Sequence, residues 1–138
     1  MKYLTEYKVL SGQVDITNHL SNVQYYEFFK SALFSFLQEY KFSTLNQPLD
    51  LWPVVFNESC EFFKEVMFNE PVFIEIFFTD LSEKKHKYLC HGIMKNKNGE
   101  RLAYWKSLHG VMNRTTRKIE PMSEKAFNLL KKFSEELL

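Results

Sequence analysis

The chain has 138 residues, of which 45% are hydrophobic and 17% aromatic, and its formal net charge is +1. This length is typical of one domain, so we expect a single domain over residues 1–138 that forms its own hydrophobic core. The near-neutral charge argues against nucleic-acid binding, and no segment has the roughly 18 consecutive apolar residues of a membrane span.

Two further features of the composition bear on location and assembly. Residues 1–10 lack the apolar core and cleavage site of a secretory signal, and Cys60 and Cys90 lie in separate apolar stretches. We therefore expect two reduced, buried thiols and a cytoplasmic location. The 14 Phe and 7 Tyr residues are more aromatic surface than a small domain hides easily. They indicate a shared interface, an apolar ligand slot, or both.

The first part of the chain combines a short strand, a polar loop and a long helix. Residues 3–10 are expected to form the strand, and residues 11–21 are rich in turn formers and predict a loop. Residues 22–40 contain no Gly or Pro and repeat apolar residues at a spacing of three to four, which predicts one helix capped by Ser21 or Asn22. Because this helix is apolar on most sides, we expect other elements to wrap around it.

The second part is expected to be a meander of strands followed by a closing helix. Residues 41–52 predict an irregular connection, and after Pro53 the apolar residues alternate with polar ones. Asn96-Lys97-Asn98-Gly99 is a strong hairpin signal, because Asn and Gly tolerate positive φ angles. The predicted strands are residues 54–62, 72–80, 86–96 and 101–113. Ser123 is expected to cap the last helix, whose apolar face is formed by Phe127, Leu130, Phe133 and Leu137.

This order of elements predicts an α+β fold. One strand, one long helix and four strands joined by short links are typical of an antiparallel sheet with a helix packed against it. Antiparallel sheets twist, so the sheet is expected to curl around the helix. The expected architecture is therefore an antiparallel sheet wrapped around one long central helix.

The loop before the helix carries a recognisable motif. Residues 15–25 read Asp-Ile-Thr-Asn-His-Leu-Ser-Asn-Val-Gln-Tyr. They resemble the loop Asp-x-x-Gly/Asn-His-Val-Asn-Asn-x-x-Tyr of the hotdog-fold acyl-CoA thioesterases, most closely the 4-hydroxybenzoyl-CoA thioesterase-like family. The matching positions are Asp15, Asn18, His19, Asn22 and Tyr25. Leu20 is a conservative replacement, whereas Ser21 departs from the first of the paired asparagines.

The resemblance extends to a second, weaker motif. Family members often have an aromatic residue, Arg-Pro, an apolar residue and a Gly-Asp turn before the next strand. Residues 62–66, Phe-Phe-Lys-Glu-Val, and Asn69-Glu70 keep this shape. Glu65 stands where proline is usual, and Asn69-Glu70 replaces Gly-Asp.

The resemblance implies a hotdog fold and an acyl-CoA thioesterase that hydrolyses an acyl thioester to a free acid and the CoA thiol, with no cofactor. It also implies a homodimer or homotetramer, with active sites at the dimer interface. Three alternatives stay open: an acyl-carrier-protein thioesterase, a hydratase, and a non-catalytic acyl-thioester-binding module. A metal site is not expected, because His86, Cys90 and His91 do not have the spacing of metal ligands.

Four residues are the catalytic candidates. Asp15 can attack the thioester carbonyl or activate water, and in the family the matching aspartate acts as nucleophile or as general base. The alternative is a turn aspartate that binds its own backbone. Backbone N–H groups near Asn22 and Val23, at the start of the helix, can bind the oxyanion. His19 can orient the substrate, share a proton with Asp15, or simply hold the loop.

Four further residues are candidates for substrate binding: Asn18, Tyr25, Tyr26 and Glu58. The alternative roles are a turn residue for Asn18 and core packing for Tyr25. Glu58 interrupts an apolar strand face, so it either faces a site or lies at a bulge that exposes it. A CoA nucleotide would need surface cations, and the candidates are Lys84, Lys85 and Lys87, or Arg114, Arg117 and Lys118.

Overall fold

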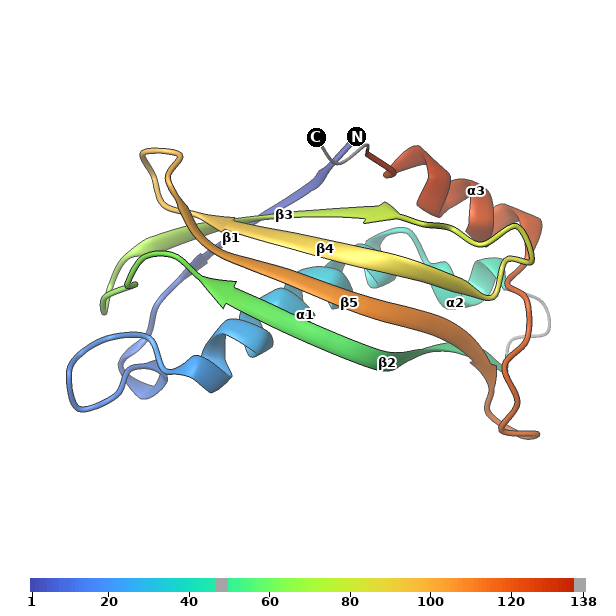
Figure 1. Cartoon of the computed structure of the whole chain (residues 1–138), viewed down its shortest axis with the longest axis horizontal. Helices are drawn as coiled ribbons and strands as arrows, with labels where there is room; N and C mark the ends of the chain where they lie inside the picture. Colours follow the sequence, from blue (N-terminus) through green and yellow to red (C-terminus); the bar gives the residue numbers. More distant parts are fainter. Residues whose placement is uncertain (47–49, 136–138) are drawn as a thin grey trace.

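The computed structural model describes residues 1–46 and 50–135 (Figure 1). Residues 47–49 of the expected connection and Leu137 of the expected closing helix lie outside the described residues. The elements in chain order are β1 (Tyr3–Lys8), the single-turn helix η1 (Ser11–Gln13), α1 (Asn22–Glu39), α2 (Phe42–Leu45), β2 (Leu51–Phe62), β3 (Pro71–Thr79), β4 (Lys87–Lys95), β5 (Arg101–Asn113) and α3 (Glu124–Lys132).

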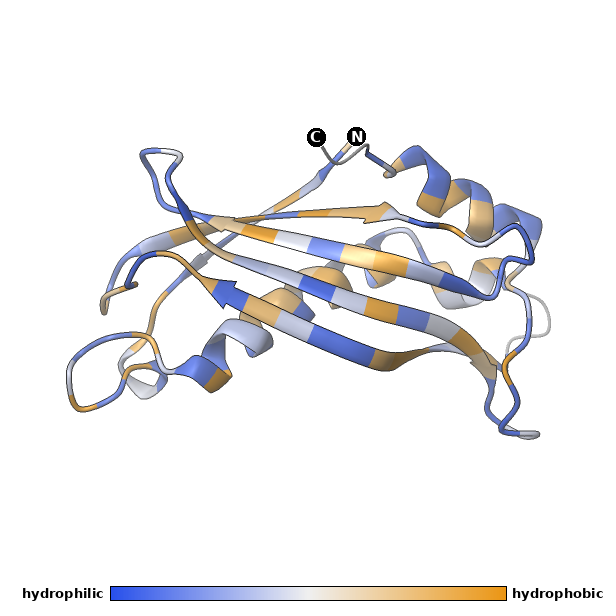
Figure 2. Ribbon diagram, viewed as in Figure 1, coloured by the Kyte–Doolittle hydropathy of each residue, from blue (hydrophilic) through white to orange (hydrophobic). Residues whose placement is uncertain are grey.

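The strands form one antiparallel sheet of five strands in the order β1-β3-β4-β5-β2. The prediction of an α+β fold is thereby confirmed. α1 lies along one face of this sheet (Figure 1). Figure 2 shows that the hairpin between β4 and β5 is hydrophilic. β3 pairs on both sides, with β1 and β4, and all its residues are buried or half-buried. No helix in the two described ranges is long and apolar enough to cross a membrane.

The position of α1 on the sheet is fixed by aromatic packing at its centre. The Phe29 ring stacks on the Trp105 ring of β5, with 5.6 Å between centroids and 11° between planes. Gly92 of β4 makes this possible, because a Cβ atom at Gly92 would lie 2.5 Å from the Phe29 ring. Towards the end of the helix, Phe36 packs against Phe78 of β3. Both α1 side chains are fully buried, so the helix cannot slide along the sheet without opening the core.

Several boundaries differ from the predictions for identifiable reasons. β1 ends at Lys8, and β2 begins at Leu51, inside the stretch expected to be irregular, which also contains α2. Pro53 is tolerated within β2 because β2 is an edge strand that pairs on one side only, with β5. The pairing of β2 with β5 shifts between Val55 and Asn57, which is a β-bulge.

The two local signals at turns and caps are confirmed. Gly99 has a φ of +80° in the hairpin between β4 and β5, and its N–H donates to the Asn96 carbonyl. Ser123 precedes α3, and its hydroxyl accepts the Ala126 N–H. Ser21 precedes α1, but its side chain makes no capping hydrogen bond, so the first N–H groups of α1 are left without a side-chain cap.

Candidate active site

The loop between β1 and α1 is held as a narrow, ordered turn. The Asp15 N–H donates to the His19 carbonyl at 2.9 Å, and the Leu20 N–H donates to the Val66 carbonyl at 2.7 Å. Asn18 has a φ of +68°, which closes the turn, and an isolated β-bridge joins His19 to Met67. The loop is therefore anchored to the segment between β2 and β3, and it delivers the chain directly to the start of α1.

Asp15 is an exposed carboxylate that the loop keeps ionised. Its Oδ1 accepts the Thr17 N–H at 2.9 Å and the Thr17 hydroxyl at 2.5 Å, and it lies 3.4 Å from the His19 nitrogen. These hydrogen bonds, the one from the Thr17 hydroxyl above all, lower the pKa of Asp15 below its ordinary value. Asp15 is thus a turn aspartate through Oδ1, while its Oδ2 has no hydrogen-bond partner among the described residues.

His19 does not share a proton with Asp15 in this arrangement. Its Nε2 lies 3.2 Å from Oε2 of Glu65, while the contact with the Asp15 carboxylate comes from the His19 backbone N–H. The imidazole therefore links the loop to the segment after β2. This placement agrees with the alternative of a histidine that holds the loop.

A pocket of about 320 Å³ brings Asp15 together with the start of α1. Four predicted site residues line it, namely Asp15, His19, Asn22 and Tyr25. Leu20 and the residues 62–65 at the end of β2 complete it. The Asn22 and Val23 N–H groups have no acceptor among the described residues, as expected for the first turn of a helix. A carboxylate and free backbone donors thus stand at the mouth of one cavity.

Tyr25 is a buried wall of this pocket. Its ring meets the Phe62 ring edge-on at 4.8 Å, and burial raises the pKa of its hydroxyl above the ordinary value. Tyr25 therefore packs in the core, as its alternative role predicted, and it also borders the cavity.

The remaining predicted residues do not line this pocket. Val23 is exposed beside it, Tyr26 is half-buried on α1, and Asn18 contributes its carbonyl to the Phe68 N–H. Glu58 follows the bulge in β2, yet it is not fully exposed. Its carboxylate accepts the Trp105 indole N–H at 3.3 Å and lies 3.3 Å from the Lys30 ammonium of α1.

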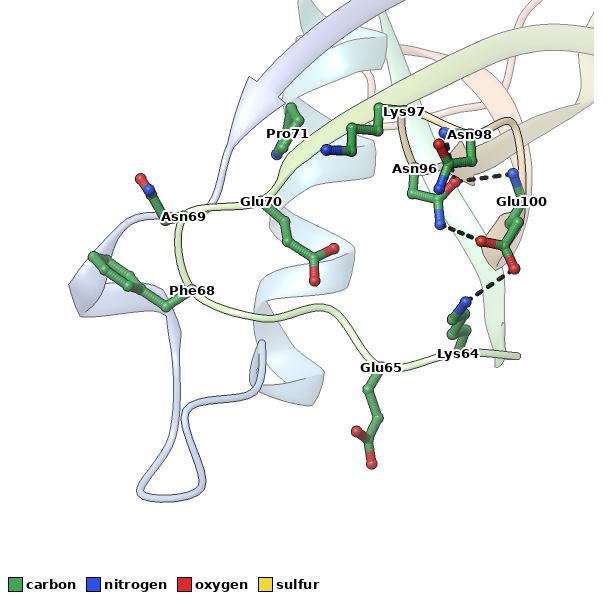
Figure 3. Close-up of a pocket in the computed structure, with 10 residues that line it drawn as sticks. All are labelled: Lys64, Glu65, Phe68, Asn69, Glu70, Pro71, Asn96, Lys97, Asn98 and Glu100. Atoms are coloured by element: carbon green, nitrogen blue, oxygen red, sulfur yellow. Dashed lines mark hydrogen bonds and ion pairs between the residues drawn. The ribbon is translucent and has the colours of Figure 1, made fainter.

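A second, polar pocket of about 440 Å³ adjoins the first (Figure 3). The two share Lys64 and Glu65, and the second pocket continues towards the hairpin between β4 and β5. The amides of Asn96 and Asn98 line it. Lys64 lies 2.9 Å from Glu100, which also accepts a hydrogen bond from the Asn96 amide. The pocket therefore carries amides and charges of both signs.

Sequence reasoning missed the cations that adjoin the site. Lys64 and Lys97 line the polar pocket. The cations that the sequence suggested for a CoA nucleotide lie at the other end of the sheet. Lys84, Lys85 and Lys87 stand at the start of β4, and Arg114, Arg117 and Lys118 follow β5. A strand of nine residues separates the two ends by roughly 25 Å. The signal that pointed to Lys64 was its place in the weaker motif after β2.

No group of three or more His, Cys, Asp or Glu side chains in the described ranges is arranged to hold a metal ion. Cys60 and Cys90 are free thiols, and Cys90 is buried whereas Cys60 is only half-buried. The chemistry available at the pocket is therefore that of a carboxylate, backbone N–H groups, an imidazole and a lysine.

The sequence profile of the thioesterase-like superfamily matches residues 9–133. No match was found among curated proteins.

Solved structures similar to this chain include a hypothetical protein from Staphylococcus aureus in complex with CoA, at 12% identity and a TM-score of 0.85, covering 100% of this chain and 89% of that one. A 1,4-dihydroxy-2-naphthoyl-CoA thioesterase from Synechocystis has 15% identity and a TM-score of 0.80, covering 99% and 100%. A probable thioesterase from Escherichia coli has 16% identity and a TM-score of 0.81, covering 96% and 99%. At these identities the likeness shows the fold.

Replacing Thr17 by valine is expected to raise the pKa of Asp15 towards its ordinary value. The Thr17→Val change removes the hydroxyl that donates to the ionised carboxylate, while the backbone N–H remains. A carbon-detected NMR titration of the Asp15 carboxyl group measures this shift. In the control Thr44→Val, which removes a hydroxyl that donates to the Lys41 carbonyl, the Asp15 titration should not change. An unchanged titration in Thr17→Val would contradict the assigned cause.

Proposed function

Because this chain belongs to the thioesterase-like superfamily, we propose that it is an enzyme that hydrolyses acyl-CoA thioesters to a free acid and the CoA thiol. The observation that carries the proposal is the pocket in which the Asp15 carboxylate and the free N–H groups at the start of α1 lie together. The similarity to a fold seen with bound CoA in the Staphylococcus aureus protein supports CoA as the thiol carrier.

Asp15 supplies the attacking group. Oδ1 is occupied by Thr17, so Oδ2 is the oxygen available to the substrate. The lowered pKa keeps the Asp15 carboxylate ionised at neutral pH, and the ionised form is the one that can attack the carbonyl carbon directly. Oδ2 forms a bond to the carbonyl carbon, and the thiolate leaves with the electron pair of the C–S bond. Water then cleaves the resulting anhydride and restores Asp15.

The start of α1 stabilises the charge that develops on the carbonyl oxygen. The N–H groups of Asn22 and Val23 are unpaired in the described structure, and the helix dipole favours negative charge at this end. Donors fixed by a helix need no reorganisation as the oxyanion forms. His19 and Glu65, which form an ion pair and also line the pocket, orient the substrate.

The polar pocket receives the thiol carrier. The pantetheine arm of CoA contains two amides, and the side-chain amides of Asn96 and Asn98 can exchange hydrogen bonds with them. Lys97 has no ion-pair partner among the described residues and can meet a phosphate, whereas Lys64 is paired with Glu100. An acyl-carrier protein presents the same pantetheine arm, so the choice of CoA rests on the similar structure with bound CoA.

The proposal also covers the domain that carries the site and its location in the cell. Residues 1–138 form one hotdog domain in which α1 is the central helix and the sheet curls around it. A cytoplasmic location is supported by the two free cysteines, which do not form a disulfide.

The proposed enzyme is a homo-oligomer, with the homodimer as its basic unit. β2 is an edge strand of 12 residues, twice the length of β1 at the other edge. A long strand with one unpaired edge and apolar side chains is a template for pairing with a second chain. The exposed apolar residues along and just after β2 are Trp52, Val55, Phe56, Phe62 and Phe63. A tetramer would be two such dimers.

Replacing Asp15 by asparagine is expected to lower kcat for acyl-CoA hydrolysis by at least about a hundredfold. The Asp15→Asn side chain has nearly the same shape but neither attacks well nor accepts a proton. Thiol release from a panel of acyl-CoAs measures the effect. The control Asp80→Asn changes an exposed aspartate outside the pocket and should retain activity. Near-wild-type activity in Asp15→Asn would refute the assignment of Asp15.

Sedimentation equilibrium at micromolar concentration is expected to give a mass of at least twice the 16.6 kDa of the chain. A charge introduced on the β2 edge by Val55→Glu should shift the protein towards monomer. Leu4→Glu places the same charge on the exposed face of β1, at the other edge, and should leave the assembly unchanged. A wild-type protein that sediments as a monomer would contradict the proposed assembly.

A further inference from the structure

α1 and β2 border one another along a line that we call the α1–β2 seam. It is defined by two successive contacts. At one end, the Tyr25 ring of α1 packs edge-on against the Phe62 ring of β2, in the pocket that also holds Asp15. Further along, Lys30 pairs with Glu58. From the first contact to the second, the residue numbers rise along α1, from Tyr25 to Lys30, and fall along β2, from Phe62 to Glu58. The seam therefore leads away from Asp15 along the helix.

A third cavity, which is apolar, lies beyond the far end of the seam. A pocket of about 480 Å³ lies there between the end of α1, α2 and the start of β2. The apolar residues that line it are Phe34, Leu37, Phe42, Trp52 and Pro53. The Lys30–Glu58 pair therefore stands between the catalytic pocket and this far cavity.

The α1 side of the seam is apolar apart from Lys30. Val23, Tyr26, Lys30 and Phe34 follow one another at spacings of three or four residues, so they share a face of the helix. Val23 is 67% exposed and Phe34 is 58% exposed, which is unusual for such side chains in a helix packed on a sheet. An apolar strip thus starts at the catalytic pocket and is interrupted once, by a charge.

The Glu58 side of the ion pair is held in place by a hydrogen bond from Trp105. Glu58 Oε2 lies 3.3 Å from the Lys30 ammonium, and Glu58 Oε1 accepts the indole N–H of Trp105 at 3.3 Å. Trp105 is fully buried and carries the stacked Phe29 ring, so this anchor is rigid. The Glu58 side chain is 22% exposed and the Lys30 side chain is 49% exposed. An apolar chain laid against the pair would strip water from both charges, which is costly.

We propose that the Lys30–Glu58 pair sets the maximum length of the acyl chain. The inference rests on the proposed hydrolysis at Asp15. A thioester bound there sends two arms away from the carbonyl: the thiol carrier enters the polar pocket, and the acyl chain follows the apolar strip of α1. The chain ends at the ion pair, and the far cavity stays out of its reach.

The structure gives an approximate length for this site. Seven residues separate Val23 from Lys30, which is about 10 Å along a helix axis at 1.5 Å per residue. Carbon–carbon bonds of about 1.5 Å advance an extended hydrocarbon chain by roughly 1.3 Å each, so about eight carbons fit. Short and medium acyl groups are therefore the preferred substrates.

The test is an acyl-length profile of kcat/KM, measured by thiol release from butanoyl-, hexanoyl-, octanoyl-, dodecanoyl- and hexadecanoyl-CoA. In the wild type, kcat/KM should fall beyond octanoyl-CoA. The double variant Lys30→Ala/Glu58→Gln removes both charges and keeps an acceptor for the Trp105 N–H. Its ratio of kcat/KM for dodecanoyl-CoA to that for hexanoyl-CoA should rise at least about tenfold, because the far cavity becomes accessible.

A matched control separates this effect from the general loss of an ion pair. Lys85→Ala/Glu124→Gln removes an ion pair at the other end of the sheet and should leave the ratio unchanged. A wild-type preference for hexadecanoyl-CoA, or the same ratio in a folded Lys30→Ala/Glu58→Gln protein, would overturn the length limit while leaving hydrolysis at Asp15 intact. Absence of thiol release from every acyl-CoA would instead overturn the proposed function and the length limit with it.

Discussion

The stack of Phe29 on Trp105 above Gly92 is the contact on which the rest of the arrangement depends. It fixes the position of α1 on the sheet, because Phe29 can stack on Trp105 at this one place, where Gly92 has no side chain to collide with the ring. Because the centre of the helix is fixed, its first turn lies beside the 14–20 loop and the end of β2. The same indole donates to Glu58, so Trp105 also positions the charge in the α1–β2 seam.

The local chemistry of the loop then determines what can happen at the start of the helix. The hydrogen bond from the Leu20 N–H to the Val66 carbonyl anchors the loop that carries Asp15, and Thr17 keeps the Asp15 carboxylate ionised. Ser21 leaves the first N–H groups of α1 uncapped by its side chain. An uncapped helix start is slightly less stable than a capped one, so these donors remain available to a substrate at a modest cost in stability.

Local signals predicted the elements well, whereas contacts between distant elements were not predictable. Helical spacing, the Asn-Gly hairpin and the Ser123 cap depend on neighbouring residues, and β5 was placed at its observed bounds. The contacts of His19 with Glu65 and of Glu58 with Lys30 depend on how separate elements pack. Glu58 shows the limit most clearly. A bulge near Glu58 was one of the predicted alternatives, and that alternative had the side chain exposed. In the structure, Trp105 and Lys30 hold the side chain instead.

The most direct test of the account is a crystal structure with a ketone analogue of octanoyl-CoA that has a methylene group between the sulfur and the carbonyl carbon. The account predicts that the ketone oxygen lies within hydrogen-bond distance of the Asn22 or Val23 N–H. Asp15 Oδ2 should face the carbonyl carbon, and the acyl chain should point towards Lys30. A ketone oxygen bound away from the start of α1, with Asp15 remote from the carbonyl carbon, would contradict it.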